Sequence, residues 1–166
     1  DHSDSLGATA RYGEGDVQWL TTGSGIMHSE MFPLLEPDKP NPLELFQIWL
    51  NLPPQSKMVE PHFGMLWSET IPTVTPAAGV SVDLITGPMG DSIPPSAPPN
   101  SWASQDGSDM AVWLIRLDHG SKWDLPAAPT GVNRMLHMFM GDDVRVDGTA
   151  IEGKVGVKLD PSNDVT

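Results

Sequence analysis

Glycine and proline interrupt this chain so often that the sequence itself disfavours long helices. The 166 residues include 16 glycines and 17 prolines, and these recur at short intervals along most of the chain. Proline removes a helical hydrogen bond and glycine lowers helical stability, so regular structure between them has to be short. Many short strands joined by Gly/Pro turns are typical of barrels and sandwiches. The sequence therefore predicts an all-β fold.

Alternating apolar residues locate several of the expected strands. Runs with a period of two residues occur at 80–84, 111–117 and 155–159. Because successive strand side chains point to opposite faces, these runs predict half-buried strands. Residues 43–52 differ, since they are nearly all apolar. They are predicted to form a strand that is covered on both faces.

A break in these patterns divides the chain. A polar, proline-bearing stretch covers residues 68–76, and a second set of strand patterns follows it. We place a domain boundary near residue 70, which gives an incomplete N-terminal barrel at 1–70 and an incomplete C-terminal barrel at 71–166. The proline-rich residues 93–99 are interpreted as a stiff loop inside the second domain.

The charge and the missing cysteines exclude several classes of function. The net charge is −13, and a surface this acidic repels phosphate, so no direct nucleic-acid binding is expected. The absence of cysteine excludes disulfides and thiolate metal sites and fits a reducing, cytoplasmic location. No apolar run approaches the roughly 18 residues of a membrane span, so no membrane association is predicted.

The ends of the chain suggest a fragment. The sequence starts at Asp1 without a methionine and finishes in the turn-rich stretch 160–166. We therefore expect residues before Asp1 and after Thr166 in the parent protein.

The segment around His28 carries the chemistry. Residues 17–20 alternate as a strand, and Gly23 and Gly25 bracket a tight turn, where a missing Cβ permits positive φ or close backbone approach. The chain then resumes as a strand on which His28 and Glu30, two residues apart, share one face. An imidazole nitrogen and a carboxylate oxygen suit a divalent ion such as iron, zinc, copper or nickel.

The spacing alone leaves two interpretations open, because a His-x-Glu pair also occurs on ordinary surface strands. A metal site would need two further ligands, and the other histidines are poor candidates. His2 lies near the terminus and is kept out of the site. His62 is predicted in a loop, His119 in a turn, and His137 as a hydrogen-bonded core residue.

One long motif resembles a known family. The run Gly-Asp-Val-Gln-Trp-Leu-Thr-Thr-Gly-Ser-Gly-Ile-Met-His-Ser-Glu-Met is similar to the signature of the pirin family. The resemblance covers most of residues 2–148. The segments that carry it are 15–31, 47–53, 57–61, 98–103, 113–117 and 132–136.

The resemblance implies a bicupin, in which two double-stranded β-helix (cupin) barrels are joined by a short linker. It implies one mononuclear metal, usually iron, in the N-terminal barrel, and no metal in the second barrel. The family's His-x-Glu ligands map onto His28 and Glu30. Its remaining two ligands, a His-x-His pair, would lie upstream of Asp1.

Three interpretations of function remain. The first is a quercetin 2,3-dioxygenase-type oxidoreductase that uses a divalent metal and O₂ on a flavonol, with Glu30 as metal ligand and possible base. The second is a non-enzymatic, redox-sensing regulatory protein that acts through protein partners. The third is a scaffold that binds no metal and is inactive as the isolated 166 residues, since two ligands rarely hold a metal tightly.

Overall fold

Short strands make up nearly all the regular structure of the computed structural model, which describes all residues from 1 to 166. The helical part consists of three single-turn 3-10 helices, Pro54–Ser56, Ser68–Thr70 and Trp102–Ser104. The predicted all-β class is confirmed. The strands are β1 (His2–Asp4), β2 (Thr9–Ala10), β3 (Val17–Thr21), β4 (His28–Glu30), β5 (His62–Leu66), β6 (Thr73–Ala77), β7 (Val80–Thr86), β8 (Val112–Leu117), β9 (Arg134–His137), β10 (Arg145–Val146), β11 (Thr149–Ala150) and β12 (Gly156–Leu159).

The strands form five small sheets in two compact units. The first unit comprises Asp1–Pro72 and Ile85–Ala111, and the second comprises Thr73–Leu84 and Val112–Thr166. The domain boundary near residue 70 stays a prediction. No helix in the structure has the length and apolar character of a membrane-spanning segment.

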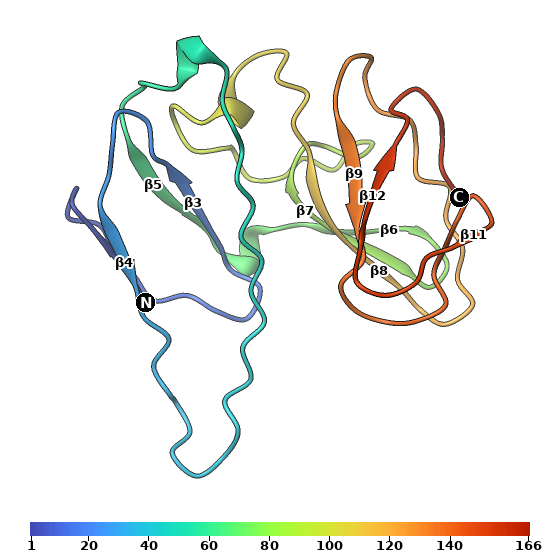
Figure 1. Cartoon of the computed structure of the whole chain (residues 1–166), viewed down its shortest axis with the longest axis horizontal. Helices are drawn as coiled ribbons and strands as arrows, with labels where there is room; N and C mark the ends of the chain where they lie inside the picture. Colours follow the sequence, from blue (N-terminus) through green and yellow to red (C-terminus); the bar gives the residue numbers. More distant parts are fainter. The chain divides into compact units, whose positions relative to one another are not determined.

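Two antiparallel sheets organise the first unit. One sheet has the order β2-β1-β4, and the other is the pair β3-β5, which Figure 1 shows side by side. In the pair, Leu20 lies opposite Phe63 and Gln18 lies opposite Met65, so these four side chains share one face. This face is the one that meets the side chains of β1 and β4.

Burial in the second unit follows the alternation of its sequence. Val80, Val82 and Leu84 on β7 are 1%, 0% and 0% exposed, while the residues between them are half-buried. β7 lies between β6 and β8 in a three-stranded sheet. A second apolar cluster is built on Leu125 and Leu159, with Val165 beside them. The strands predicted within 80–84, 111–117 and 155–159 are therefore confirmed, as β7, β8 and β12.

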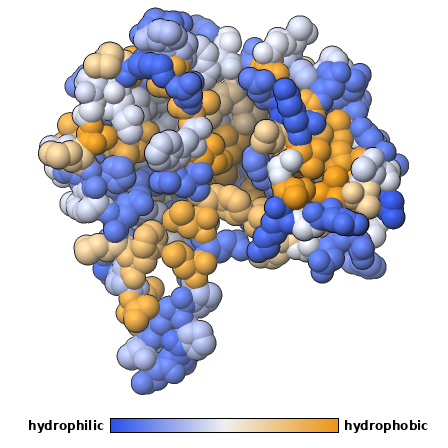
Figure 2. All heavy atoms as spheres, viewed as in Figure 1, coloured by the Kyte–Doolittle hydropathy of each residue, from blue (hydrophilic) through white to orange (hydrophobic).

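The strand predicted at residues 43–52 is absent. Figure 1 shows residues 31–52 as a long excursion without helix or strand. Its apolar side chains are exposed, with Trp49 at 86% and Leu34 at 79%, and Figure 2 shows apolar residues on the surface of this excursion. A strand needs a neighbouring strand to pair with, and residues 43–52 belong to none of the sheets. The prediction inferred burial from apolar composition. Burial also requires another strand or helix to pack against the segment.

Candidate metal centre

A glycine turn delivers the chain from β3 into β4. Gly23 and Gly25 both have positive φ, at 49° and 132°. A Cβ at Gly23 would overlap the backbone carbonyl oxygen of Val59, which accepts a 2.9 Å hydrogen bond from the Ser24 amide. The sequence-based interpretation of this turn is confirmed, since both positive φ and close backbone approach are present.

Cross-strand register places four polar side chains on one face. His2 lies opposite Glu30, and Asp4 lies opposite His28, in the antiparallel pair β1–β4. Directly opposed residues and residues two apart share a face of a sheet. His28 and Glu30 thus share that face with the imidazole of His2 and the carboxylate of Asp4.

The facing sheet holds Glu30 in place. The side-chain amide of Gln18, on β3, donates to Glu30 Oε1 at 2.8 Å, and the Tyr12 hydroxyl donates to the same oxygen at 3.2 Å. Burial, with the neighbouring Glu30 charge, raises the pKa of Tyr12, so its hydroxyl keeps the proton that it donates. Two donors on one oxygen fix the orientation of the carboxylate and leave Oε2 with no hydrogen-bond partner in the structure.

The ring of His28 is exposed, and its neighbour is the buried His2. The centroids of these two rings lie 5.6 Å apart, with an interplanar angle of 24°. The sequence analysis places His2 outside the site. The signal that could have found it is its alternation with Asp4, which β1 shares with the His-x-Glu pair of β4.

The remaining histidines lie in three different settings. His62 begins β5 and is half-buried, so its predicted loop is wrong. His119 lies in a turn, as predicted. His137 ends β9 with its side chain exposed, so it is not the core residue that its apolar neighbours suggested. The settings of His62 and His137 depend on which strands pair with β5 and β9. The neighbouring sequence does not reveal that pairing.

The donor set fits a divalent metal by type but not by number. A histidine nitrogen and an oriented carboxylate oxygen are ligands that iron, zinc and related ions accept. Mononuclear sites with protein ligands usually take three or more. The structure brings no group of three or more His, Cys, Asp or Glu side chains into a metal-binding arrangement. His28 and Glu30 are therefore two donors of a site that needs others.

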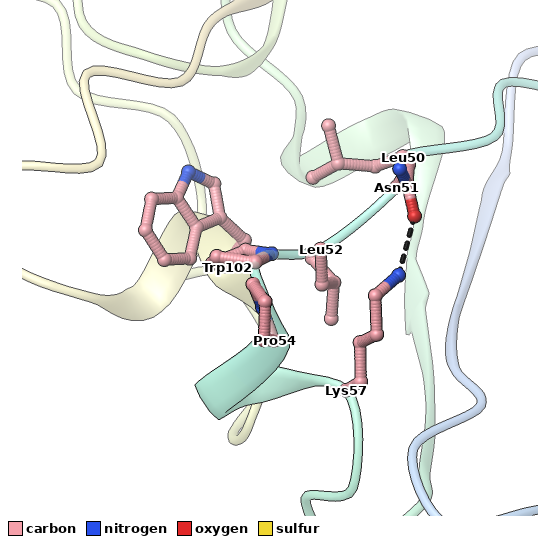
Figure 3. Close-up of a pocket in the computed structure, with 7 residues that line it drawn as sticks. Leu50, Asn51, Leu52, Pro54, Lys57 and Trp102 are labelled. Atoms are coloured by element: carbon pink, nitrogen blue, oxygen red, sulfur yellow. Dashed lines mark hydrogen bonds between the residues drawn. The ribbon is translucent and has the colours of Figure 1, made fainter.

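A separate pocket of about 500 Å³ lies elsewhere in the first unit. Its wall is mainly apolar, and the ammonium group of Lys57 donates to the Asn51 side-chain oxygen at 2.5 Å, as Figure 3 shows. Neither His28 nor Glu30 contributes to it. The lining residues are Leu50, Asn51, Leu52, Pro53, Pro54, Lys57 and Trp102.

The fold matches a solved enzyme. The crystal structure of quercetin 2,3-dioxygenase from Acinetobacter baumannii aligns with 99% of this chain and 54% of its own, with a TM-score of 0.59 and 21% identity. The all-β, cupin-type fold class is confirmed by this likeness. The complete bicupin arrangement stays a prediction, since the strands described here form five small sheets.

The family follows from sequence comparison. The Pirin family model matches residues 1–50. Human pirin is 42% identical over 86 residues, which cover 52% of this chain and 28% of pirin. A pirin-like protein of Caulobacter vibrioides is 37% identical over 161 residues, 95% of this chain and 53% of that protein. The chain is thus a relative of the pirins, as its signature motif predicted.

A relative from Pseudomonas aeruginosa is provisionally named a quercetin 2,3-dioxygenase. It is 34% identical over 149 residues, which cover 87% of this chain and 49% of the relative. The chain spans about half the length of this relative and of the Caulobacter protein.

Proposed function

We propose that this chain is part of a quercetin 2,3-dioxygenase-type oxidoreductase, in which His28 and Glu30 bind one mononuclear divalent metal. Iron is the expected ion, although the same donors accept other divalent transition metals. The proposal extends to a flavonol as substrate, to O₂ as co-substrate and to a cytoplasmic location. The further histidine ligands belong to residues outside the 166, in agreement with the greater length of the relatives.

The observation that carries the proposal is the way Glu30 is held. Gln18 of the facing sheet and Tyr12 of the loop before it both donate to Oε1, so residues outside β4 orient the carboxylate while Oε2 has no hydrogen-bond partner. A surface glutamate would not need two converging donors from residues 12 and 18 positions away. His28 lies two residues before it on the same face.

Each side chain has a defined task under this proposal. His28 supplies a neutral imidazole nitrogen, and Glu30 supplies a carboxylate oxygen. A divalent metal, when bound, supplies Lewis-acid chemistry that lowers the pKa of a coordinated hydroxyl. Glu30 would also accept the hydroxyl proton of a flavonol, and the two donors on Oε1 leave Oε2 as the oxygen available for it.

The test is O₂ consumption with quercetin by the full-length protein that contains these residues, loaded anaerobically with ferrous iron. Glu30→Gln is expected to lower the rate by at least about 100-fold, because a ligand and a base are lost together. Glu36→Gln, an exposed carboxylate outside the site, is the matched control and is expected to retain the rate. A wild-type rate no higher than that of free iron would contradict the proposal.

A second candidate is a regulatory protein that acts through a protein partner. The observation in its favour is the exposed apolar surface of residues 31–52. Partner binding that changes with the oxidation state of the metal, together with no turnover of quercetin, would favour this candidate over the enzyme.

A further inference from the structure

A fully buried His–Asp pair lies beside the proposed ligands without being one of them. The side chains of His2 and Asp4 are both 0% exposed, and His2 Nε2 lies 3.0 Å from Asp4 Oδ2. Buried ionisable groups are costly unless they are paired, so such a pair calls for an explanation. Both residues share a face with His28 and Glu30.

Asp4 is fixed before it meets His2. Its Oδ1 accepts hydrogen bonds from the backbone amides of Leu6 at 2.9 Å and Ala8 at 3.0 Å. The hydrogen bond to His2 is the main cause that lowers the pKa of Asp4, so the carboxyl is ionised and can only accept. The proton of the His2–Asp4 bond therefore belongs to Nε2, and Asp4 determines the plane of the His2 ring.

The fixed His2 ring stacks on two others. Its centroid lies 4.1 Å from that of Phe63 at an interplanar angle of 9°, and 5.6 Å from that of His28 at 24°. Phe63 belongs to β5, in the facing sheet. The exposed His28 ring thus stacks on the His2 ring, which the buried Asp4 carboxylate and the half-buried Phe63 ring hold in place.

His2 is a poor choice if packing is its only purpose. Its Nδ1 is buried and has no hydrogen-bond partner. An unsatisfied buried polar atom costs stability, and a phenylalanine would make the same stack without that cost. What histidine adds is the Nε2–H bond to Asp4, which locks the ring about its own axis.

We propose that His2, oriented by Asp4 and Phe63, is a positioning residue that sets the ring plane of His28 for metal binding. The inference rests on the function proposed above. Partners that orient a metal-bound histidine commonly change metal affinity by 10–100-fold when they are removed. His2 differs from such partners in acting by ring stacking, so the inference needs both a ring at position 2 and the hydrogen bond to Asp4 that orients it.

The first test needs no metal. In the metal-free protein, the ring-proton shifts of His28 are measured by NMR and assigned from their loss in His28→Ala. His2→Leu is expected to move them toward the values of free histidine, since the ring current is lost. His2→Phe, combined with Asp4→Asn to avoid an unpaired carboxylate, is expected to keep them displaced. Unchanged shifts in His2→Leu would overturn the inference.

The second test titrates the full-length protein with Co²⁺ and follows its visible absorption. His2→Leu is expected to weaken binding about 10–100-fold. The double variant keeps the ring but lacks its hydrogen bond to residue 4, so it is expected to weaken binding less than His2→Leu does. If His2→Leu does not fold, Phe63→Leu removes the supporting ring and is expected to weaken binding, whereas Phe63→Tyr does not.

The outcomes separate the two proposals. Unchanged Co²⁺ binding in His28→Ala would overturn the proposed metal site and, with it, the purpose assigned to His2. Loss of binding in His28→Ala but none in His2→Leu would overturn the positioning role alone. Loss in the double variant as complete as in His28→Ala would make His2 itself a ligand, which also overturns the positioning role.

Discussion

Strand β7 and residues 43–52 are both largely apolar in sequence, but only β7 forms a buried strand. Both are short and largely apolar, with Val, Leu and Ile in β7 and chiefly Leu in residues 43–52, and both are predicted strands. β7 pairs on both sides, and its apolar residues at 80, 82 and 84 are at most 1% exposed. Residues 43–52 form no strand, and Leu43 and Ile48 are each 65% exposed.

The difference shows that an apolar strand pattern forms a strand only where partner strands are available to pair with it. An isolated strand leaves its backbone groups to water and buries little apolar surface. β7 has β6 and β8 within hydrogen-bonding distance, so its pattern is satisfied. Residues 43–52 pair with no strand. An exposed apolar stretch of this kind is also a site of unwanted association.

The largest expected effect sets the two regions against each other directly. Leu84→Ala should lower the free energy of unfolding by about 2–5 kcal/mol, because it leaves a cavity at a fully buried site. Leu45→Ala, the same substitution at a side chain 48% exposed, should change it by less than about 0.5 kcal/mol. Urea denaturation followed by circular dichroism measures both. Equal losses would show that residues 43–52 are packed in solution.

The next effect is smaller and compares side-chain hydrogen bonds in the second unit with those in the excursion at residues 31–52. Arg134 donates to the carbonyl oxygens of Leu125, Pro126 and Asn163, and thereby joins distant segments of the second unit. Arg134→Met should cost about 1.5 kcal/mol, the low end for charged donors, since two of these bonds are exposed.

Asn41 provides the matched control, because it also makes several backbone hydrogen bonds, all within residues 35–41 of the excursion. Asn41→Ala should leave the midpoint of urea unfolding nearly unchanged, because that local turn supports no buried structure. A midpoint shift as large as that of Arg134→Met would mean that the excursion is part of the cooperative fold.

The smallest expected effect depends on pH. Asp16 accepts from the backbone amides of Ser68, 52 residues away, and Gly13, and these hydrogen bonds lower its pKa. Its contribution is present above the unfolded-state pKa of about 4 and is lost as pH falls through the lower folded-state pKa. Asp16→Asn should cost less than about 1 kcal/mol at pH 7 and flatten the acid limb of stability.

The control for this experiment is Asp38→Asn, which removes the same charge from the exposed excursion. Thermal unfolding between pH 2 and 7 compares the two variants with wild type. An acid limb that is as steep in Asp16→Asn as in wild type would remove Asp16 from the explanation.

Much of the first unit could be predicted where local chemistry decides the structure. Gly23 and Gly25 mark the turn because no other residue tolerates its backbone, and the period of two residues marks β3 and β7. Pairing between distant strands could not be predicted. The sequence predicts His62 in a loop after a proline. Pairing with β3 instead makes it the first residue of β5, where it lies opposite Thr21.

The candidate site divides in the same way. The shared face of His28 and Glu30 could be predicted from spacing alone, since strand geometry puts residues two apart on one face, whereas their assignment as metal ligands rests on the family resemblance. His2 and Gln18 were not, because their relation to the site depends on register and on a facing sheet. The strand predicted at residues 43–52 is wrong for the same reason, since its burial depends on pairing with another strand.

The sequence by itself determined the all-β class, the family resemblance and the shared face of residues 28 and 30, because turns and the two-residue strand period are local properties of the backbone. Only the tertiary structure decided that Gln18 and Tyr12 hold Glu30, that His2 stacks beside His28, and that residues 43–52 form no strand. These facts join residues far apart in the chain, and such contacts depend on which strands meet.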